Sequence, residues 1–196
     1  MLFSFISYLE HEKRVSRHTV LAYQKDLDQF MEFINRAFGM AHLEEAGHAE
    51  VRAWMVDLIE EGLEVATVNR KIATLRSFYK FLLRSEIISK DPTFKIRSLK
   101  KGRTLPAFIQ EKEIQKLLEE NNFALDFEGQ RDRMVMQILY LTGIRLSELI
   151  GLKWSSVDLS QLQIKVLGKG KKFRIIPISG GLIHAILAYK KVFEDS

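Results

Sequence analysis

Residues 66–84, ATVNRKIATLRSFYKFLLR, decide the fold of the first half of the chain. Apolar residues recur there every three or four positions, which is the spacing of an amphipathic helix. At about 100° per residue, one stripe of this helix is apolar and faces a core. It contains Val68, Ile72, Leu75, Tyr79, Leu82 and Leu83. The opposite arc is basic, polar or small, so we predict a helix with one core face and one open face.

The open face has the character of a nucleic-acid contact surface. Long basic side chains reach phosphates, whereas Ala66, Ala73 and a serine let the helix backbone approach a groove. An ordinary solvated face is the alternative, but such faces mix both signs of charge and this arc contains no acid. We therefore predict DNA contacts from Asn69, Arg70, Arg76, Ser77, Lys80 and Arg84.

Three more helices are expected before this one, within residues 2–9, 20–34 and 51–59, where apolar side chains again follow helical spacing. Ser16 is a candidate cap for the second helix, and Gly62 ends the third. Four helices without a strand pattern predict a small helical domain. We place its limits at residues 1–90.

A basic stretch bounded by Pro92 and Pro106 follows this domain. Proline disfavours helical geometry in the residue before it, so residues 91–106 are assigned to an interdomain linker. Its predicted DNA contacts are Lys100, Lys101 and Arg103.

Charge is distributed unevenly along the 196 residues, whose formal net charge is +5. Residues 1–64 carry six basic and twelve acidic side chains, whereas residues 65–103 carry eleven basic and two acidic ones. A second basic group without an acid comprises Lys165, Lys169, Lys171, Lys172 and Arg174. Two separated basic groups favour a protein that binds a phosphate backbone at two places. The alternative is that both groups are ordinary solvated basic surfaces.

The second half of the chain combines helices with a β-hairpin. Helical spacing appears around residues 114–118, 135–142 and 145–152. Residues 162–166 then alternate apolar and polar side chains, and a glycine- and lysine-rich turn leads into a return strand at 173–178. A last helix opens at Gly180-Gly181. The predicted fold class is mostly α with a small β-hairpin or sheet, an α+β arrangement.

Two features of this half suggest chemistry. Arg145 follows a helix stop at Gly143, and Glu148 lies three residues on, where it can orient the guanidinium. Such a guanidinium suits a phosphodiester because its planar fork binds two oxygens. Lys169, at the hairpin tip, is placed to donate a proton. Surface Arg-x-x-Glu pairs and turn lysines are also common without any function.

Other kinds of protein are disfavoured by composition. Cysteine is absent, which excludes disulfides and thiolate sites and favours a reducing, cytoplasmic location. No apolar run reaches the roughly 18 to 20 residues that cross a bilayer, so we expect no membrane association. The histidines show no metal-ligand spacing. We expect neither a metal nor another cofactor.

Four segments carry a recognisable pattern: Thr19-x-x-x-Tyr23-x-x-Asp26-Leu27, residues 69–82, residues 142–149 (TGIRLSEL) and residues 166–177 (VLGKGKKFRIIP). In this order they resemble the tyrosine recombinase (phage integrase) family, most closely its Xer-like members. The first two look like the family's core-binding domain. The third looks like its first catalytic-arginine box, and the fourth looks like its catalytic-lysine hairpin.

The resemblance implies a four-helix SAM-like core-binding domain at residues 1–90 and the N-terminal portion of a catalytic domain at residues 107–196, which together clamp double-stranded DNA. Arg145 would hold the scissile phosphate, Glu148 would support it, and Lys169 would protonate the leaving 5′ oxygen. Strands would be broken and rejoined through a 3′-phosphotyrosyl intermediate in a homo- or hetero-tetramer. The hairpin residues Lys171, Lys172 and Arg174 would contact DNA.

The sequence lacks three parts of the family pattern: the His-x-x-Arg box, a further His or Trp, and the C-terminal tyrosine nucleophile. His184 has no arginine three residues on, and Tyr189 lies on the helix directly after the hairpin. We therefore expect an incomplete or shortened recombinase that binds DNA without cutting it. A non-catalytic module that occupies recombination sites or modulates a full-length recombinase is the second hypothesis. A helical protein-interaction domain with an incidental basic surface is the third.

Overall fold

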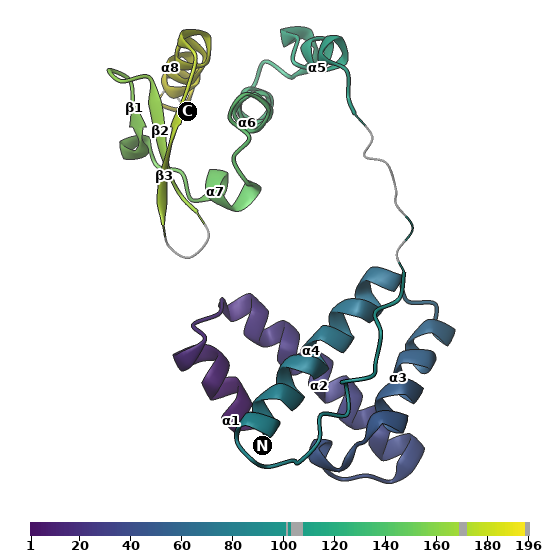
Figure 1. Cartoon of the computed structure of the whole chain (residues 1–196). Coiled ribbons are helices and arrows are strands. Elements are labelled where there is room, and N and C mark those ends of the chain that lie inside the picture. The colour runs from purple at the N-terminus through teal and green to yellow at the C-terminus, as the bar shows by residue number, and fades with distance from the viewer. Residues whose placement is uncertain (101, 103–107, 169–171, 195–196) are drawn as a thin grey trace. The chain divides into compact units, whose positions relative to one another are not determined.

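The computed structural model describes residues 1–100, 102, 108–168 and 172–194. The chain divides into two compact units, Met1–Leu105 and Pro106–Ser196, which we call the N-terminal and C-terminal units (Figure 1). Each unit has its own hydrophobic core. Of the helices in the described ranges, none combines the length and the apolar character that a membrane crossing requires.

The N-terminal unit is helical throughout its regular elements. These are α1 (Leu2–Ser7), a π-helical turn η1 (Tyr8–Glu12), α2 (Arg17–Phe38), a 3-10 turn η2 (Leu43–Glu45), α3 (His48–Glu60) and α4 (Val65–Arg84). The predicted caps are present. The Ser16 hydroxyl accepts a hydrogen bond from the Thr19 backbone at the start of α2, and Gly62 adopts a left-handed φ of 79° just beyond α3.

The central helix of this unit is α4, which packs against both α2 and α3 (Figure 1). Its predicted apolar stripe is buried, with Leu75 and Tyr79 fully inaccessible. The Tyr79 hydroxyl donates a hydrogen bond to the Leu43 carbonyl at 2.7 Å, and burial raises the pKa of that hydroxyl. Leu83 is 38% exposed, so its assignment to the core face was wrong. It lies at the edge of the predicted stripe, the part of an amphipathic helix that borders its open face.

Residues 91–99, assigned to the linker from sequence, return along α4 and pack on it (Figure 1). Ile96 is 6% exposed and joins the core of the N-terminal unit, with Leu99 packed beside that core. Asp91 fixes the start of the segment, because its Oδ1 accepts hydrogen bonds from the backbone and the hydroxyl of Thr93. These residues therefore belong to the N-terminal unit.

The C-terminal unit contains helices and a small sheet, which confirms the predicted fold class. Its elements are α5 (Glu111–Leu117), η3 (Glu120–Asn122), α6 (Phe127–Thr142), α7 (Leu146–Ile150), η4 (Trp154–Ser156), β1 (Val157–Asp158), β2 (Gln163–Leu167), β3 (Phe173–Pro177) and α8 (Gly180–Glu194). The strands are antiparallel in the order β1-β2-β3. The predicted hairpin is β2 and β3, and β1 was not predicted because two residues are too short to show alternation.

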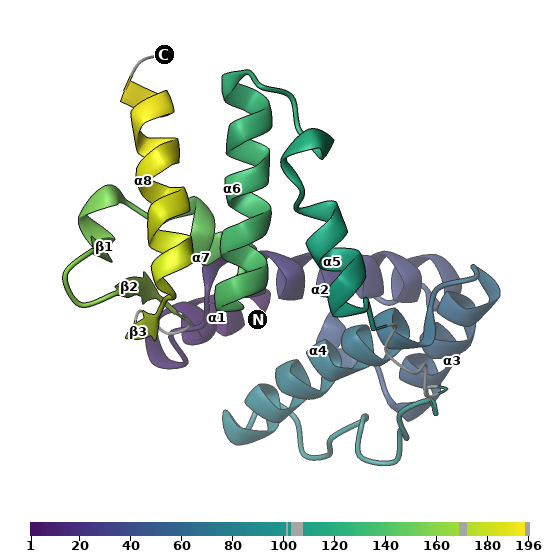
Figure 2. The same cartoon turned by 90° about the horizontal axis from the view of Figure 1, so that it is seen from above.

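The core of this unit lies between the sheet and two helices. Helix α8 packs against α6 (Figure 2). The inward residues Ile164 and Val166 of β2 are buried, whereas Lys165 between them is exposed, as a period of two requires. Gly143 ends α6 with a left-handed φ of 61°, a conformation that glycine adopts without a steric cost. The chain turns there and places Arg145 at the start of α7.

Candidate nucleic-acid interface and active site

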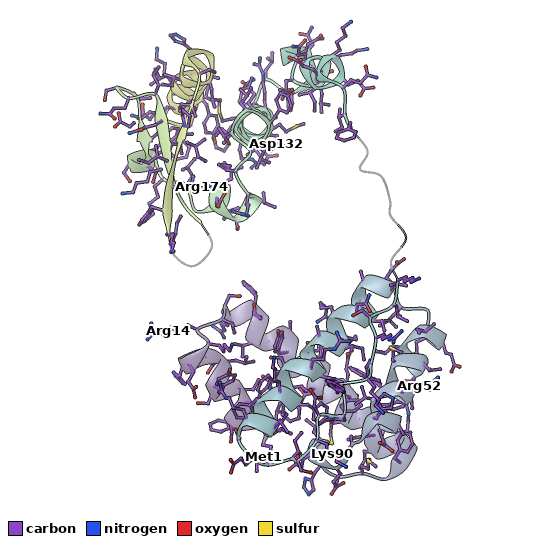
Figure 3. All side chains as sticks on the ribbon, viewed as in Figure 1. Met1, Arg14, Arg52, Lys90, Asp132 and Arg174 are labelled. Carbon is purple, nitrogen blue, oxygen red and sulfur yellow. The ribbon has the colours of Figure 1, made fainter. Side chains whose placement is uncertain are left out.

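A buried carboxylate gathers two guanidinium groups in the C-terminal unit. Glu148 Oε2 accepts the Arg145 backbone N–H at 2.8 Å, and Oε1 accepts the Arg145 side chain at 2.9 Å. Arg174 of β3 donates its Nη2 to Glu148 Oε2 at 2.8 Å; Figure 3 labels Arg174 on this strand. We call these three residues the Glu148 cluster. It brings together a predicted catalytic pair and a predicted DNA contact.

The Glu148 cluster presents excess positive charge to solvent. The Glu148 side chain is 3% exposed, whereas those of Arg145 and Arg174 are 62% and 43% exposed. The hydrogen bond from the Arg145 backbone lowers the pKa of Glu148, and the two guanidinium groups lower it further. Two arginine forks that stay charged and share one counter-charge are suited to holding the oxygens of a phosphodiester.

The base of the β2–β3 hairpin lies against the Glu148 cluster. A Cβ atom placed on Gly168 would be 3.5 Å from Glu148 Oε1, so the strand end closely approaches the carboxylate. The Gly168 N–H donates a hydrogen bond to the Lys172 carbonyl at 2.7 Å, and Lys172 is exposed. The predicted general acid Lys169 and the predicted contact Lys171 lie outside the described residues.

The predicted open face of α4 is basic but narrower than expected. Arg70, Lys80 and Arg84 are exposed, and Ser77 is half-buried. Arg84 turns back toward η1, where its guanidinium lies 4.6 Å from the Tyr8 ring centroid and 3.7 Å from Glu12. The Lys80 side chain makes no hydrogen bond or ion pair within the described part of the chain.

Asn69 and Arg76, which the sequence places on that open face, are half-buried against residues 96–99. The Asn69 side chain donates to the Leu99 carbonyl at 3.0 Å and accepts from the Leu99 N–H at 2.8 Å. Arg76 donates to the Ile96 carbonyl and to the Ser98 hydroxyl. Their placement on an open face was therefore wrong, because a helix considered alone cannot show that a later segment covers one edge of it.

The returning segment itself carries basic residues. Lys95 and Arg97 are exposed there and were not predicted as contacts, whereas Lys100 is exposed and was predicted. Lys101 and Arg103, also predicted, lie outside the described residues. The basic surface of the N-terminal unit is thus shared between α4 and the segment that lies on it.

Sequence reasoning missed a buried polar cluster beneath α4. Asp26 of α2 is 1% exposed and accepts hydrogen bonds from Arg70, Lys71 and Thr74 of α4. We call these four residues the Asp26 cluster. The sequence offers little indication of this cluster. Lys71 and Thr74 lie on the border between the apolar stripe and the open arc of α4, and helical spacing does not show which other helix faces them. In the described ranges, no three His, Asp or Glu side chains are grouped to hold a metal ion.

Known proteins share both units of this chain. Residues 2–86 match the family described as "Phage integrase, N-terminal SAM-like domain", and residues 107–196 match "Phage integrase family". The chain is 35% identical over 185 residues to tyrosine recombinase XerC of Bacillus pumilus, covering 94% of this chain and 60% of that protein. It is 37% identical over 186 residues to XerC of Oceanobacillus iheyensis, covering 95% and 60%. The chain thus spans about 60% of the length of the curated relatives it matches.

Solved structures share the fold at lower identity. One is the Tn1549 transposon integrase in complex with circular intermediate DNA, with a TM-score of 0.70, 20% identity, and coverage of 95% of this chain and 63% of that chain. Another is a lambda integrase dimer bound to a COC′ core site, with a TM-score of 0.62, 20% identity, and coverage of 90% and 48%. With both halves matched by integrase families and XerC relatives aligned over most of its length, this chain belongs to the phage integrase family of tyrosine recombinases.

Proposed function

We propose that this chain binds duplex DNA through the basic surfaces of its two units, and that in a complete recombinase Arg145 and Glu148 serve the site-specific breaking and rejoining of DNA strands. The observation that carries the proposal is the Glu148 cluster, in which a buried carboxylate holds two half-exposed guanidinium groups. Two solved structures with this fold are integrases bound to DNA, which supports the same substrate class.

The cluster suits phosphoryl transfer in the following way. Arg145 and Arg174 bind the non-bridging oxygens of the scissile phosphate, and their charge opposes the negative charge that builds up in the pentacoordinate transition state. Glu148 holds both guanidinium groups in place. A tyrosine hydroxyl attacks phosphorus and forms the 3′-phosphotyrosyl bond while the bond to the 5′ oxygen breaks. By the family resemblance, Lys169 protonates that leaving oxygen.

The attacking tyrosine is not one of the residues near the cluster. Of the two tyrosines in the C-terminal unit, Tyr189 stacks with Phe127 and packs beside Trp154, at centroid distances of 6.1 and 6.2 Å. Within the described residues, no hydrogen bond or ring contact joins Tyr140 or Tyr189 to the Glu148 cluster. We therefore propose that this 196-residue chain binds DNA without cleaving it. The homo- or hetero-tetramer on DNA belongs to the same proposal for the full-length protein.

Binding is tested by measuring duplex affinity by fluorescence anisotropy over a range of salt concentrations. If the chain neutralises several phosphates, the logarithm of the association constant falls with the logarithm of salt by about 0.9 for each phosphate. Arg145→Ala and Arg174→Ala should each weaken binding. Arg131→Ala is the matched control, because Arg131 is an exposed arginine of α6 paired with its neighbour Asp132. A salt-independent affinity contradicts the proposal.

Cleavage is tested by incubating the chain with a nicked duplex that traps covalent protein–DNA complexes on a denaturing gel. We expect no covalent complex from this chain. A complex that disappears in Tyr140→Phe or Tyr189→Phe would show that the chain carries its own nucleophile and would contradict the second part of the proposal.

A further inference from the structure

The Asp26 cluster joins the buried side of α4 to its exposed basic side. Asp26 Oδ1 accepts from Arg70 Nη2 at 2.9 Å and Lys71 Nζ at 3.2 Å. Oδ2 accepts from Arg70 Nη1 at 2.5 Å and the Thr74 hydroxyl at 2.8 Å. A carboxylate offers about four lone-pair sites, so Asp26 is fully used. Each of its two oxygens accepts a hydrogen bond from one Nη atom of the Arg70 guanidinium.

Lys71 already supplies the counter-charge that burial of Asp26 requires. The Lys71 side chain is 7% exposed, its ammonium also donates to Gln29 Oε1, and it lies 5.8 Å from the Trp54 ring centroid. Arg70 is a second cation on the same carboxylate, and its side chain is 49% exposed. One positive charge of the cluster is therefore not neutralised, and it is on the residue that reaches solvent.

The grip on Arg70 restricts its guanidinium to one orientation. Both Nη atoms bind Asp26, the guanidinium has three further N–H donors, and the Arg70 side chain is 49% exposed. A free arginine must lose rotamer freedom when it binds a phosphate, whereas a fork already held in place loses less. Lys80, on the same face, has no such support within the described residues.

We propose that Asp26 is a positioning residue for DNA binding, which orients the Arg70 guanidinium toward a backbone phosphate. The inference rests on the proposed DNA-binding function. Net charge alone predicts that removal of an acid from a DNA-binding protein raises its affinity for DNA. If Asp26 positions Arg70, removal of Asp26 should instead lower that affinity.

The test compares variants of the 196-residue chain in a Lys71→Met background. This background removes the buried ammonium, so Asp26→Asn does not leave a buried cation without a partner. Asp26→Asn should then weaken binding to a mixed-sequence duplex by about threefold to tenfold and reduce the salt slope by up to about 0.9. Asp28→Asn is the matched control, because Asp28 is an exposed acid on the same helix. It should leave affinity unchanged or raise it.

A double-mutant cycle separates positioning from a structural role. When Arg70→Ala is added to the Lys71→Met background, Asp26→Asn should cause no further loss of DNA affinity, because the arginine that Asp26 positions is absent. An equal loss in both backgrounds means that Asp26 acts on the fold and overturns the inference, as does unchanged or increased affinity in the first comparison. Circular dichroism checks that each variant is folded.

Arg70→Lys keeps the inference testable if the Asp26 variant does not fold. A lysine preserves the charge but cannot form the paired hydrogen bonds, so Arg70→Lys should lose nearly as much affinity as Arg70→Ala. Full affinity in Arg70→Lys overturns the inference alone. Absence of salt-dependent duplex binding by the unmodified chain overturns the proposed function itself, and the inference with it.

Discussion

Asp26 and Glu148 are both buried carboxylates that each bind two basic side chains, but the two clusters differ in how far those side chains are exposed to solvent. In the Asp26 cluster one cation, Lys71, is 7% exposed and Arg70 is 49% exposed. In the Glu148 cluster Arg145 and Arg174 are 62% and 43% exposed. The N-terminal unit thus uses its carboxylate both to balance a buried charge and to hold one outward arginine, whereas the C-terminal unit holds two.

This difference in exposure predicts that removal of the two carboxylates has different effects on folding stability and on phosphate binding. A buried cation depends on its counter-charge, because water cannot replace the lost partner. Half-exposed guanidinium groups remain solvated when their carboxylate is removed, so their loss of order affects a bound phosphate more than the fold. We therefore expect Asp26 to stabilise its unit more strongly than Glu148 stabilises the other.

The largest effect is expected for Asp26→Asn in the otherwise unmodified chain. It leaves Lys71 buried without a carboxylate, which costs about 3 to 5 kcal/mol of unfolding free energy. The chain has two tryptophans, Trp54 in the N-terminal unit and Trp154 in the C-terminal unit, so fluorine NMR of fluorotryptophan-labelled protein in urea reports each unit separately. The Trp54 resonance should show the loss and the Trp154 resonance should not.

Asp28→Asn again serves as the control and should change stability by less than about 0.5 kcal/mol. If Asp26→Asn costs no more than its control, Lys71 does not depend on Asp26 and the contrast between the clusters fails.

An intermediate effect is expected for Asn69→Ala, which extends the comparison to the segment on α4. The variant loses both hydrogen bonds to the Leu99 backbone, worth about 1 to 3 kcal/mol together. Trypsin should then cleave after Arg97 about 5- to 160-fold faster, because cleavage requires local opening of this segment. Ser77→Ala, on the same helix, should cleave at the unmodified rate. Equal rates for the two variants would mean that the packing of Ile96 and the hydrogen bonds from Arg76 hold the segment without Asn69.

The smallest effect is expected for Glu148→Gln, and it should depend on pH. Because the folded state lowers the pKa of Glu148 below its ordinary value of 4.5, the unfolded state binds more protons in that range. The stabilisation is complete above about pH 4.5 and is lost as pH falls through the lower folded value. The Trp154 urea midpoint of Glu148→Gln should therefore lie below that of the unmodified chain at pH 7 and converge with it in acid. A difference between the two urea midpoints that grows as the pH falls would contradict this prediction.

Local features of the fold were predictable because their causes lie within a few residues. The Ser16 cap acts three residues along the chain, the φ of Gly143 depends on its missing side chain, and the alternation that defines β2 needs only five residues. The Arg145–Glu148 pair belongs to this class, since a helical turn brings residues three apart together.

Contacts across longer separations were not predictable. Arg174 reaches Glu148 from 26 residues away, and Arg70 reaches Asp26 across 44. The covering of Asn69 by Leu99 depends on a segment that has no periodic pattern of its own. Such pairings follow from which surfaces pack together, and single-helix periodicity carries no information about the partner.

The amino-acid order alone determined the helices, the hairpin, the family resemblance and the arginine that begins α7, because each depends on spacing along one stretch of chain. Folding in three dimensions decided which basic side chains are open and which are held. Asn69 and Arg76 hydrogen-bond the backbone of the segment that covers one edge of α4, Arg174 shares the Glu148 carboxylate with Arg145, and Asp26 binds Arg70. The physical reason is that a buried carboxylate is stable only beside cations or hydrogen-bond donors. Which cations lie beside it depends on how the helices and strands pack around the whole core.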